Sequence, residues 1–193
     1  PGDAVSLRPT LAEYLGNQLA GGDLAAADWV GAYASNALAR VHRDTRGEWV
    51  NDTGVPARLT VRAGGGFLVN VQPAARRALV LMGEWGGGPA GGGVVPGQQV
   101  LSAPQGGAPV TIGGAFGVGR TGVGPQAGAT PEESDRLTLL DPRGGESRSC
   151  WLDAGRGEWL WRDTGEPAGD WVLEPGRGYL YYHAGQGFSW RWR

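Results

Sequence analysis

The chain of 193 residues contains no lysine and a single cysteine, Cys150. Without lysine the protein cannot form a lysine Schiff base, use a lysine general base or bind phosphate with a P-loop lysine. A lone cysteine excludes a disulfide within the chain. No apolar run approaches the roughly 18 to 20 residues that a membrane span needs, so we expect no membrane-spanning segment.

The chain also has little net charge, since 17 basic residues face 19 acidic ones. This balance argues against bulk electrostatic binding to nucleic acid or anionic lipid. The sequence is rich in glycine (37 residues) and proline (13 residues), which predicts frequent turns. A hydrophobic content of 40% with nine tryptophans excludes an intrinsically disordered chain.

The first residue is Pro1 rather than methionine. We favour removal of a signal peptide over an arbitrary chain boundary as the explanation. The expected location is therefore extracellular or at the cell surface.

Three short motifs occur twice, in the same order and about 110 residues apart. They are Arg-Gly-Glu-Trp at 46–49 and 156–159, Asp-Thr-Gly-x-Pro-Ala at 52–57 and 163–168, and Gly-x-Gly-aromatic-Leu at 64–68 and 176–180. A repeat of this kind predicts a duplicated supersecondary unit.

The repeat divides the chain into a first unit at 1–85 and a second unit at 94–193, joined by a Gly-rich linker at 86–93. The second unit carries a Gly-rich insertion at about 106–129. A weaker match between 15–19 and 96–100 places the start of each unit.

Short alternating and apolar segments predict an all-β fold, of the sandwich or small-barrel type, with at most one short helix in each unit. The expected strands lie at 59–63, 67–71, 78–82, 137–140, 150–153, 158–162, 179–183 and 188–192. Gly-containing segments at 154–157 and 184–187 predict hairpins. The expected helices are an Ala-rich one at 24–30 and one that begins in the capping-box pattern at 130–133.

The order of Gly-Asn-Gln-Leu at 16–19, a Gly-x-Trp hairpin and Pro-Gly-x-Gly-aromatic at 175–179 resembles a known repeat. It is a Gly/Trp-rich β-repeat of secreted and surface-anchored bacterial proteins. The strand-ending Gly83-Glu84 also fits this repeat, whereas the first copy lacks the proline of the turn. The resemblance implies an extracellular β module of unassigned biochemistry, and it provides no catalytic residues.

The duplicated Asp-Thr-Gly raises an enzymatic hypothesis, a bilobal aspartic protease in which Asp52 and Asp163 share a proton. The neighbouring Arg162 and Glu166 instead favour solvated turns.

The two histidines, His42 and His183, have no cysteine or carboxylate at a metal-ligand spacing, so no metal is expected. Cys150 fits a small buried hydrophobe better than the nucleophile of a Cys–His pair. No motif requires a cofactor, and we expect none.

Aromatic residues gather in the C-terminal part of the chain, where strand periodicity places them in pairs on one face of each strand. These candidate binding residues are Trp159, Trp161, Tyr179, Tyr181, Trp190 and Trp192. Three interpretations are open: a hydrophobic core, an interface with a second copy, or a platform for sugar rings.

Together these features favour a non-enzymatic structural protein that assembles with itself at the cell surface as a filament, sheath or coat subunit. Exposed strand edges would join the second unit of one copy to the first unit of the next. One alternative is a carbohydrate-binding module that holds polysaccharide on the C-terminal Trp/Tyr face, and another is the aspartic protease.

Overall fold

The computed structural model describes residues 15, 18–34, 36–59, 67–72, 91–102, 109–116, 124–139, 148–175 and 177–191. The chain forms two compact units. Unit 1 comprises Pro1–Ala32, Leu38–Arg62 and Phe67–Gly86, and unit 2 comprises Tyr33–Ala37, Ala63–Gly66 and Gly87–Arg193. The final boundary between unit 1 and unit 2 along the chain lies between Gly86 and Gly87, within the linker predicted at 86–93.

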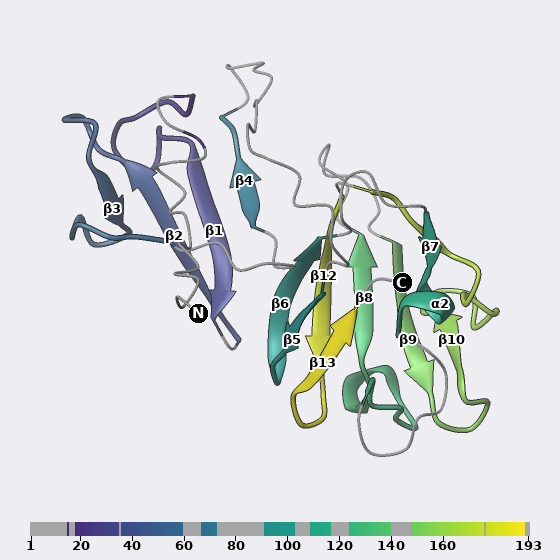
Figure 1. Ribbon diagram of the computed structural model, residues 1–193. Helices are drawn as coiled ribbons and strands as arrows, with labels where there is room; N and C mark the ends of the chain where they lie inside the picture. The colour runs from purple at the N-terminus through teal and green to yellow at the C-terminus, as the bar shows by residue number, and fades with distance from the viewer. Residues whose placement is uncertain are drawn as a thin grey trace, which may run out of the picture. The chain divides into compact units, whose positions relative to one another are not determined.

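The fold is all-β, as expected. A four-stranded sheet in the order β3-β2-β1-β4 organises unit 1 (Figure 1). Its strands are β1 (Trp29–Ala34), β2 (Ala37–Arg43), β3 (Trp49–Asn51) and β4 (Leu68–Asn70). Strands β1 and β4 pair antiparallel, and so do β2 and β3.

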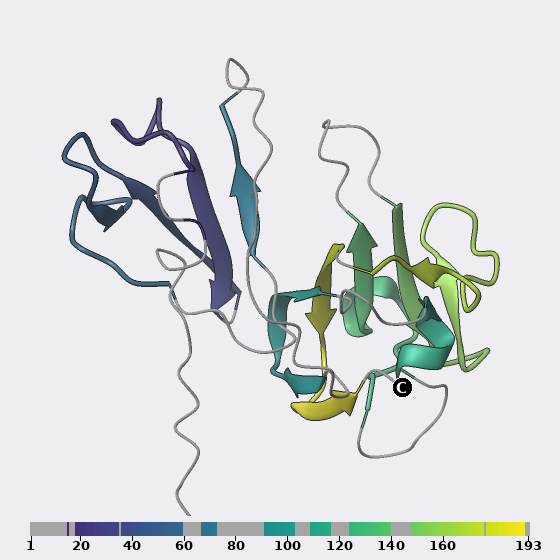
Figure 2. The same cartoon turned by 45° about the horizontal axis from the view of Figure 1, so that its top comes forward.

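Unit 2 contains a five-stranded sheet in the order β10-β9-β8-β12-β6. Its strands are β6 (Gly97–Ser102), β8 (Arg136–Leu139), β9 (Arg148–Asp153), β10 (Glu158–Trp161) and β12 (Gly178–His183). Two small sheets, β11-β7 and β13-β5, complete the unit, and Figure 2 shows β13 beside β5. The remaining elements are β5 (Gly91–Val94), β7 (Val110–Thr111), α2 (Ile112–Phe116), the 3₁₀ helix η1 (Pro131–Glu133), β11 (Val172–Leu173) and β13 (Phe188–Arg191).

Each unit has its own hydrophobic core. In unit 1 the buried residues are Leu15, Leu19, Val30 and Val41. The core of unit 2 is larger and centres on Trp159, which is 0% exposed. Burial of large aromatic side chains compensates there for a sequence that is poor in isoleucine.

The two larger sheets arrange strands in a corresponding order, with β3, β2, β1 and β4 matching β10, β9, β8 and β12. The Gly-x-Gly-aromatic-Leu motif leads into corresponding strands of the two sheets, β4 and β12. Leu68 of β4 lies opposite Gly31, and its repeat counterpart Leu180 lies opposite Thr138. The match therefore extends from single motifs to the pairing of strands.

The repeated Arg-Gly-Glu-Trp motif lies in a hairpin in both sheets, and the second hairpin is one residue longer between the tryptophan and the residue that pairs with it. In each hairpin the glycine, Gly47 or Gly157, has a positive φ, a conformation that L-residues with side chains rarely adopt. The tryptophan that follows accepts a backbone hydrogen bond from an alanine on the returning chain. The N–H of Ala57 donates to the carbonyl of Trp49 (3.0 Å), and the N–H of Ala168 donates to that of Trp159 (2.7 Å).

Several predicted elements differ in the structure. The expected helix at 24–30 is a single turn, in which the N–H groups of Ala26 and Ala27 donate to the carbonyl of Asp23, and Val30 belongs to β1. Gly91–Gly93, predicted as linker, form part of β5 and pair with β13. The segment at 15–19, matched above to 96–100, is not the counterpart of strand β6, because Leu15 is helical.

The prediction that 179–183 and 188–192 pair as a hairpin is also wrong, although strands form in both segments. Strand β12 already has β6 on one side and β8 on the other, so no edge is left for β13. The chain turns at 184–187 and β13 pairs with β5 instead.

The hairpin around 154–157 and the strands β4, β8, β9 and β10 agree with the prediction. The segment at 130–133 forms only the short 3₁₀ helix η1, with Thr130 at the N-cap and proline in the first turn, and the Thr130 side chain makes no capping hydrogen bond. The strand expected at 78–82 and all of the strand expected at 59–63 except Leu59 lie outside the described residues, as do 106–108 and 117–123 of the insertion.

The Trp159→Ala substitution should lower the free energy of unfolding by about 3–5 kcal/mol, because it leaves a large cavity in the core of unit 2. Val172, 46% exposed on β11, offers a matched control. Val172→Ala should change the free energy by no more than about 0.5 kcal/mol. Urea denaturation measures both, and equal stability of the two variants would contradict this description of the core.

Candidate functional site

Three of the six predicted binding residues lie in the core of unit 2. Trp159, Tyr179 and Tyr181 are 0%, 2% and 0% exposed. Their side chains cannot contact a second copy or a sugar, so the predicted exposed face must be corrected. Of the core, interface and glycan interpretations, these three residues fit the core.

The packing of these aromatics explains their burial. The ring of Phe116, on α2, stacks on Tyr181 with a centroid distance of 5.1 Å and lies 6.0 Å from Trp159. The short helix α2 therefore covers the face of the sheet that carries both residues. This use of the Gly-rich insertion was not apparent from its sequence.

Trp161 is half-buried at the margin of the same core. Its ring packs 5.0 Å from that of Trp171, and the Arg148 guanidinium lies 4.3 Å above it. This contact is a cation–π interaction within the unit. The side chain of Trp190 and the whole of Trp192 lie outside the described residues.

Each Asp-Thr-Gly triplet forms an exposed turn, as the solvated-turn interpretation expects. Asp52 pairs with Arg40, whose Nη2 lies 2.6 Å from its Oδ2. The carboxylate of Asp163 accepts a hydrogen bond from the N–H of Thr164 (3.0 Å). In both turns the glycine, Gly54 or Gly165, has a positive φ, which explains the repeated glycine.

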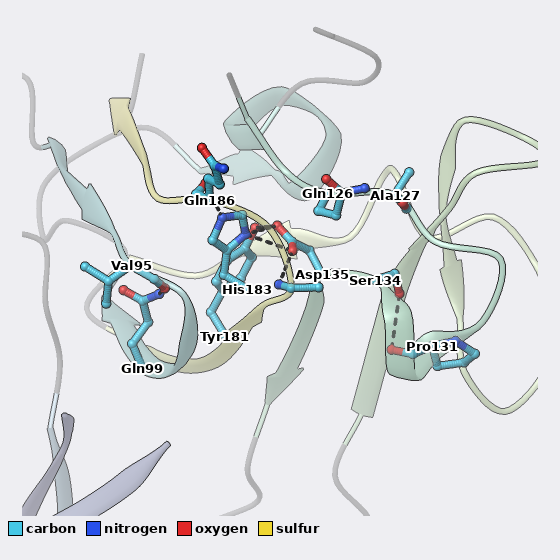
Figure 3. A network of polar contacts seen from close by, with 11 residues as sticks. Val95, Gln99, Gln126, Ala127, Pro131, Ser134, Asp135, Tyr181, His183 and Gln186 are labelled. Carbon is cyan, nitrogen blue, oxygen red and sulfur yellow. Dashed lines mark hydrogen bonds and ion pairs between the residues drawn. The ribbon is translucent and has the colours of Figure 1, made fainter. Parts of the chain in front are cut away.

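The polar residues that the fold does bring together surround Asp135, at the start of β8 (Figure 3). Asp135, Tyr181 and His183 are all almost fully buried. The hydroxyl of Tyr181 donates to Oδ2 of Asp135, and Nδ1 of His183 lies 2.9 Å from both carboxylate oxygens. The N–H of Ala184 donates to Oδ1 (2.8 Å). One buried carboxylate thus accepts hydrogen bonds from three residues of the segment 181–184.

The surroundings of His183 favour its protonated form. Its Nδ1 faces the Asp135 carboxylate, and its Nε2 lies 2.6 Å from the carbonyl oxygen of Gln186. A neutral imidazole has one N–H and could donate to only one of these acceptors. Burial by itself lowers the pKa of His183, but the hydrogen bonds to Asp135 and Gln186 and the charge of Asp135 raise it above its ordinary value.

This network is suited to bracing the fold. All of its hydrogen-bonding groups point to one another inside the unit, and burial together with the Asp135 charge raises the pKa of Tyr181. Cys150 is fully buried, and burial raises its pKa, which disfavours the thiolate that a nucleophile requires. Within the described part of the chain, no group of three or more His, Cys, Asp and Glu side chains could hold a metal ion.

Unit 1 contains a simpler version of the same brace. Asp28, at the start of β1, is 0% exposed. It accepts hydrogen bonds from the N–H groups of Gln72 (2.8 Å) and Ala20 (2.7 Å). Gln72 follows Leu68 of β4 by four residues, as Ala184 follows Leu180 of β12, so the two donors occupy corresponding positions. Sequence reasoning missed both aspartates, although each precedes a buried strand residue, Val30 or Leu137, by two positions.

Comparison with models of known protein families, with curated proteins and with solved structures finds no match. The resemblance to a surface-protein repeat therefore stays an expectation. Among the described residues, no helix is long and apolar enough to cross a membrane.

The stability of unit 2 should depend on the protonation of His183. Because its folded-state pKa is raised, its contribution is complete below the unfolded value of about 6.5 and is lost as pH rises through the folded value. Urea denaturation between pH 6 and 9 should show this loss, and His183→Gln should abolish that part of the pH dependence. An NMR titration in which the His183 ring has an ordinary or lowered pKa would contradict the assignment.

The Tyr181→Phe substitution should lower the free energy of unfolding by about 1.5–3 kcal/mol, the range for a hydrogen bond to a charged group. The ring stays in place against Phe116, so the packing is retained. Tyr182→Phe on the opposite face of β12 is the matched control, because Tyr182 is half-buried and lies outside the brace. Equal effects of the two substitutions would show that the Tyr181 hydroxyl has no special role.

Proposed function

We propose that the protein is a non-enzymatic, extracellular structural protein that assembles with copies of itself at the cell surface. Joined sheet edges would link one copy to the next. The observation that carries this proposal is a difference between two corresponding strands. Strand β12 has neighbours on both sides, β8 and β6, whereas β4 ends its sheet with β1 as its neighbour among the described residues.

A strand edge without a neighbour exposes backbone N–H and C=O groups that can pair with a further strand. Strand β4 carries no charged side chain, and charge is a common means of blocking such pairing. Among the described strands, β4 therefore offers an edge with which another strand could pair.

The opposite edges of the two sheets are covered by their own chain. Next to β3, the N–H of Asn51 donates to the carbonyl of Val55 (2.9 Å). Next to β10, the N–H of Trp161 donates to the carbonyl of Glu166 (2.8 Å). The repeated turn thus caps one edge of each sheet, and β4 and β6 are the terminal strands on the other side among the described strands. On β6, the N–H of Gln98 donates to Oδ1 of Asn36 (3.0 Å), so the edge of β6 is partly occupied.

Pairing of β6 in one copy with β4 in the next would be a head-to-tail contact. It joins different surfaces of identical chains, and such a contact forms an open filament unless its rotation closes a ring. The corresponding strand order, register and buried aspartates support an origin of the two units by duplication, which would give the chain two compatible edges.

The alternatives have less support. A glycan platform on the C-terminal face would need Trp159, Tyr179 and Tyr181 at the surface, and all three are buried. For a protease, Asp52 is already neutralised by Arg40 in an exposed ion pair rather than held in a buried loop.

Assembly is tested by Asn70→Lys, which places a positive charge on the β4 edge. Wild-type protein should form large regular particles in light scattering and negative-stain images, and Asn70→Lys should convert most of it to monomer. Ala39→Lys is the control, because it adds the same charge at an exposed position of the interior strand β2. Wild-type protein that stays monomeric, or particles that survive Asn70→Lys, would contradict edge pairing.

A further inference from the structure

A pocket of about 330 Å³ lies on the sheet of unit 1. The charged and polar side chains that line the pocket include those of Asp23, His42, Asp44, Arg46 and Asp52. Alternation along a strand places His42 of β2 and Asp44 just beyond it on one face, and Val50 of β3 lies opposite His42. The segment 22–24 forms another wall. The pocket is thus built by two strands of the same unit and by the segments 22–24, 44–46 and 52–54.

Three carboxylates line the pocket, and two of them, Asp44 and Asp52, have cationic partners. Oδ2 of Asp52 accepts hydrogen bonds from Nε and Nη2 of Arg40, at 2.9 and 2.6 Å. Oδ2 of Asp44 accepts one from Nε of Arg46 (3.1 Å), and its Oδ1 accepts two from backbone N–H groups. The charges of Asp44 and Asp52 are compensated in this way, and the lining offers a ligand many hydrogen-bond donors and acceptors.

His42 provides an independent indication of a ligand. The residue is 5% exposed and lines the pocket, and its Nδ1 has no hydrogen-bond partner among the described residues. A buried polar atom without a partner is destabilising, and a ligand group in the pocket would satisfy Nδ1 of His42. A hydroxyl group held in the pocket is the kind of partner that this nitrogen lacks.

The corresponding position of unit 2 explains why this pocket belongs to unit 1. His42 lies opposite Val50, and Trp151 lies opposite Leu160, the counterpart of Val50. Unit 2 thus carries a much larger apolar side chain where unit 1 carries an imidazole. Because the imidazole of His42 is smaller and more polar than the indole of Trp151, it leaves space at this position of unit 1 and gives the pocket a polar wall.

We infer that this pocket binds a single neutral sugar residue, at the end or on a branch of a glycan. Its volume is at the lower end of the range for small-molecule sites, which suits one sugar ring. Sugar hydroxyls can donate to Asp52 and Asp44 and accept from Arg46, while one reaches the imidazole of His42. This site differs from the C-terminal aromatic face, and it does not depend on self-assembly.

The test uses NMR on the Asn70→Lys chain, which keeps the measurement independent of assembly. The chain has two histidines, so the ¹H–¹³C spectrum of the imidazole rings contains one signal from the pocket and one, from His183, as an internal reference. Methyl glycosides of glucose, galactose, mannose and N-acetylglucosamine are titrated separately to millimolar concentrations. At least one should shift the His42 signal in a saturable way and leave that of His183 unchanged.

Three variants assign the binding to the pocket. His42→Trp copies the residue of unit 2, should fold, and should weaken binding at least tenfold by filling the cavity. Asp52→Asn should weaken it several-fold. Asp163→Asn, the same change on the corresponding turn of unit 2, should leave it unchanged.

The inference is overturned if none of the four glycosides shifts the His42 signal. It is also overturned if His42→Trp binds as tightly as the parent chain, or if putrescine, a dication without hydroxyls, binds there and the glycosides do not.

Discussion

A carboxylate that is removed from water must receive hydrogen bonds from its surroundings, and this requirement organises both units. Asp28 and Asp135 stand at the start of a central strand in each sheet, fully buried. Each accepts a backbone N–H from the residue just past the neighbouring strand, Gln72 or Ala184. Segments that are distant in the sequence are thereby fixed against each other, and with them the register of β1 with β4 and of β8 with β12.

The two units elaborate this plan differently. Unit 2 adds Tyr181 and a His183 ion pair to the carboxylate, covers its aromatic core with α2, and extends its sheet by β6. Unit 1 has a smaller core and ends its sheet at β4. The simpler unit thus retains both the open edge that we propose for assembly and the pocket around His42.

The sequence predicted the all-β class, the hairpin at 154–157 and the exposed Asp-Thr-Gly turns, because these depend on glycine positions and short-range alternation. It did not predict that β13 pairs with β5, since strand pairing is decided by which edges are already occupied. Nor did it show which aromatics are buried. Periodicity placed Trp159 and Trp161 correctly on one face, but only the packing of Phe116 from the insertion shows that this face is the core. The buried aspartates were missed because one aspartate before a strand resembles any turn residue.

If chains join through the edges of β4 and β6, as we propose, hydrogen exchange in the assembled protein should reveal the pairing. Backbone amides should be compared between assembled particles and protein dispersed by mild dilution, with mass spectrometry of peptides that cover 67–72 and 97–102. Assembly should slow exchange in these two segments and leave the capped strands β3 and β10 unchanged. Equal exchange at 67–72 and 97–102 in both states, or protection confined to other segments, would contradict the proposed pairing.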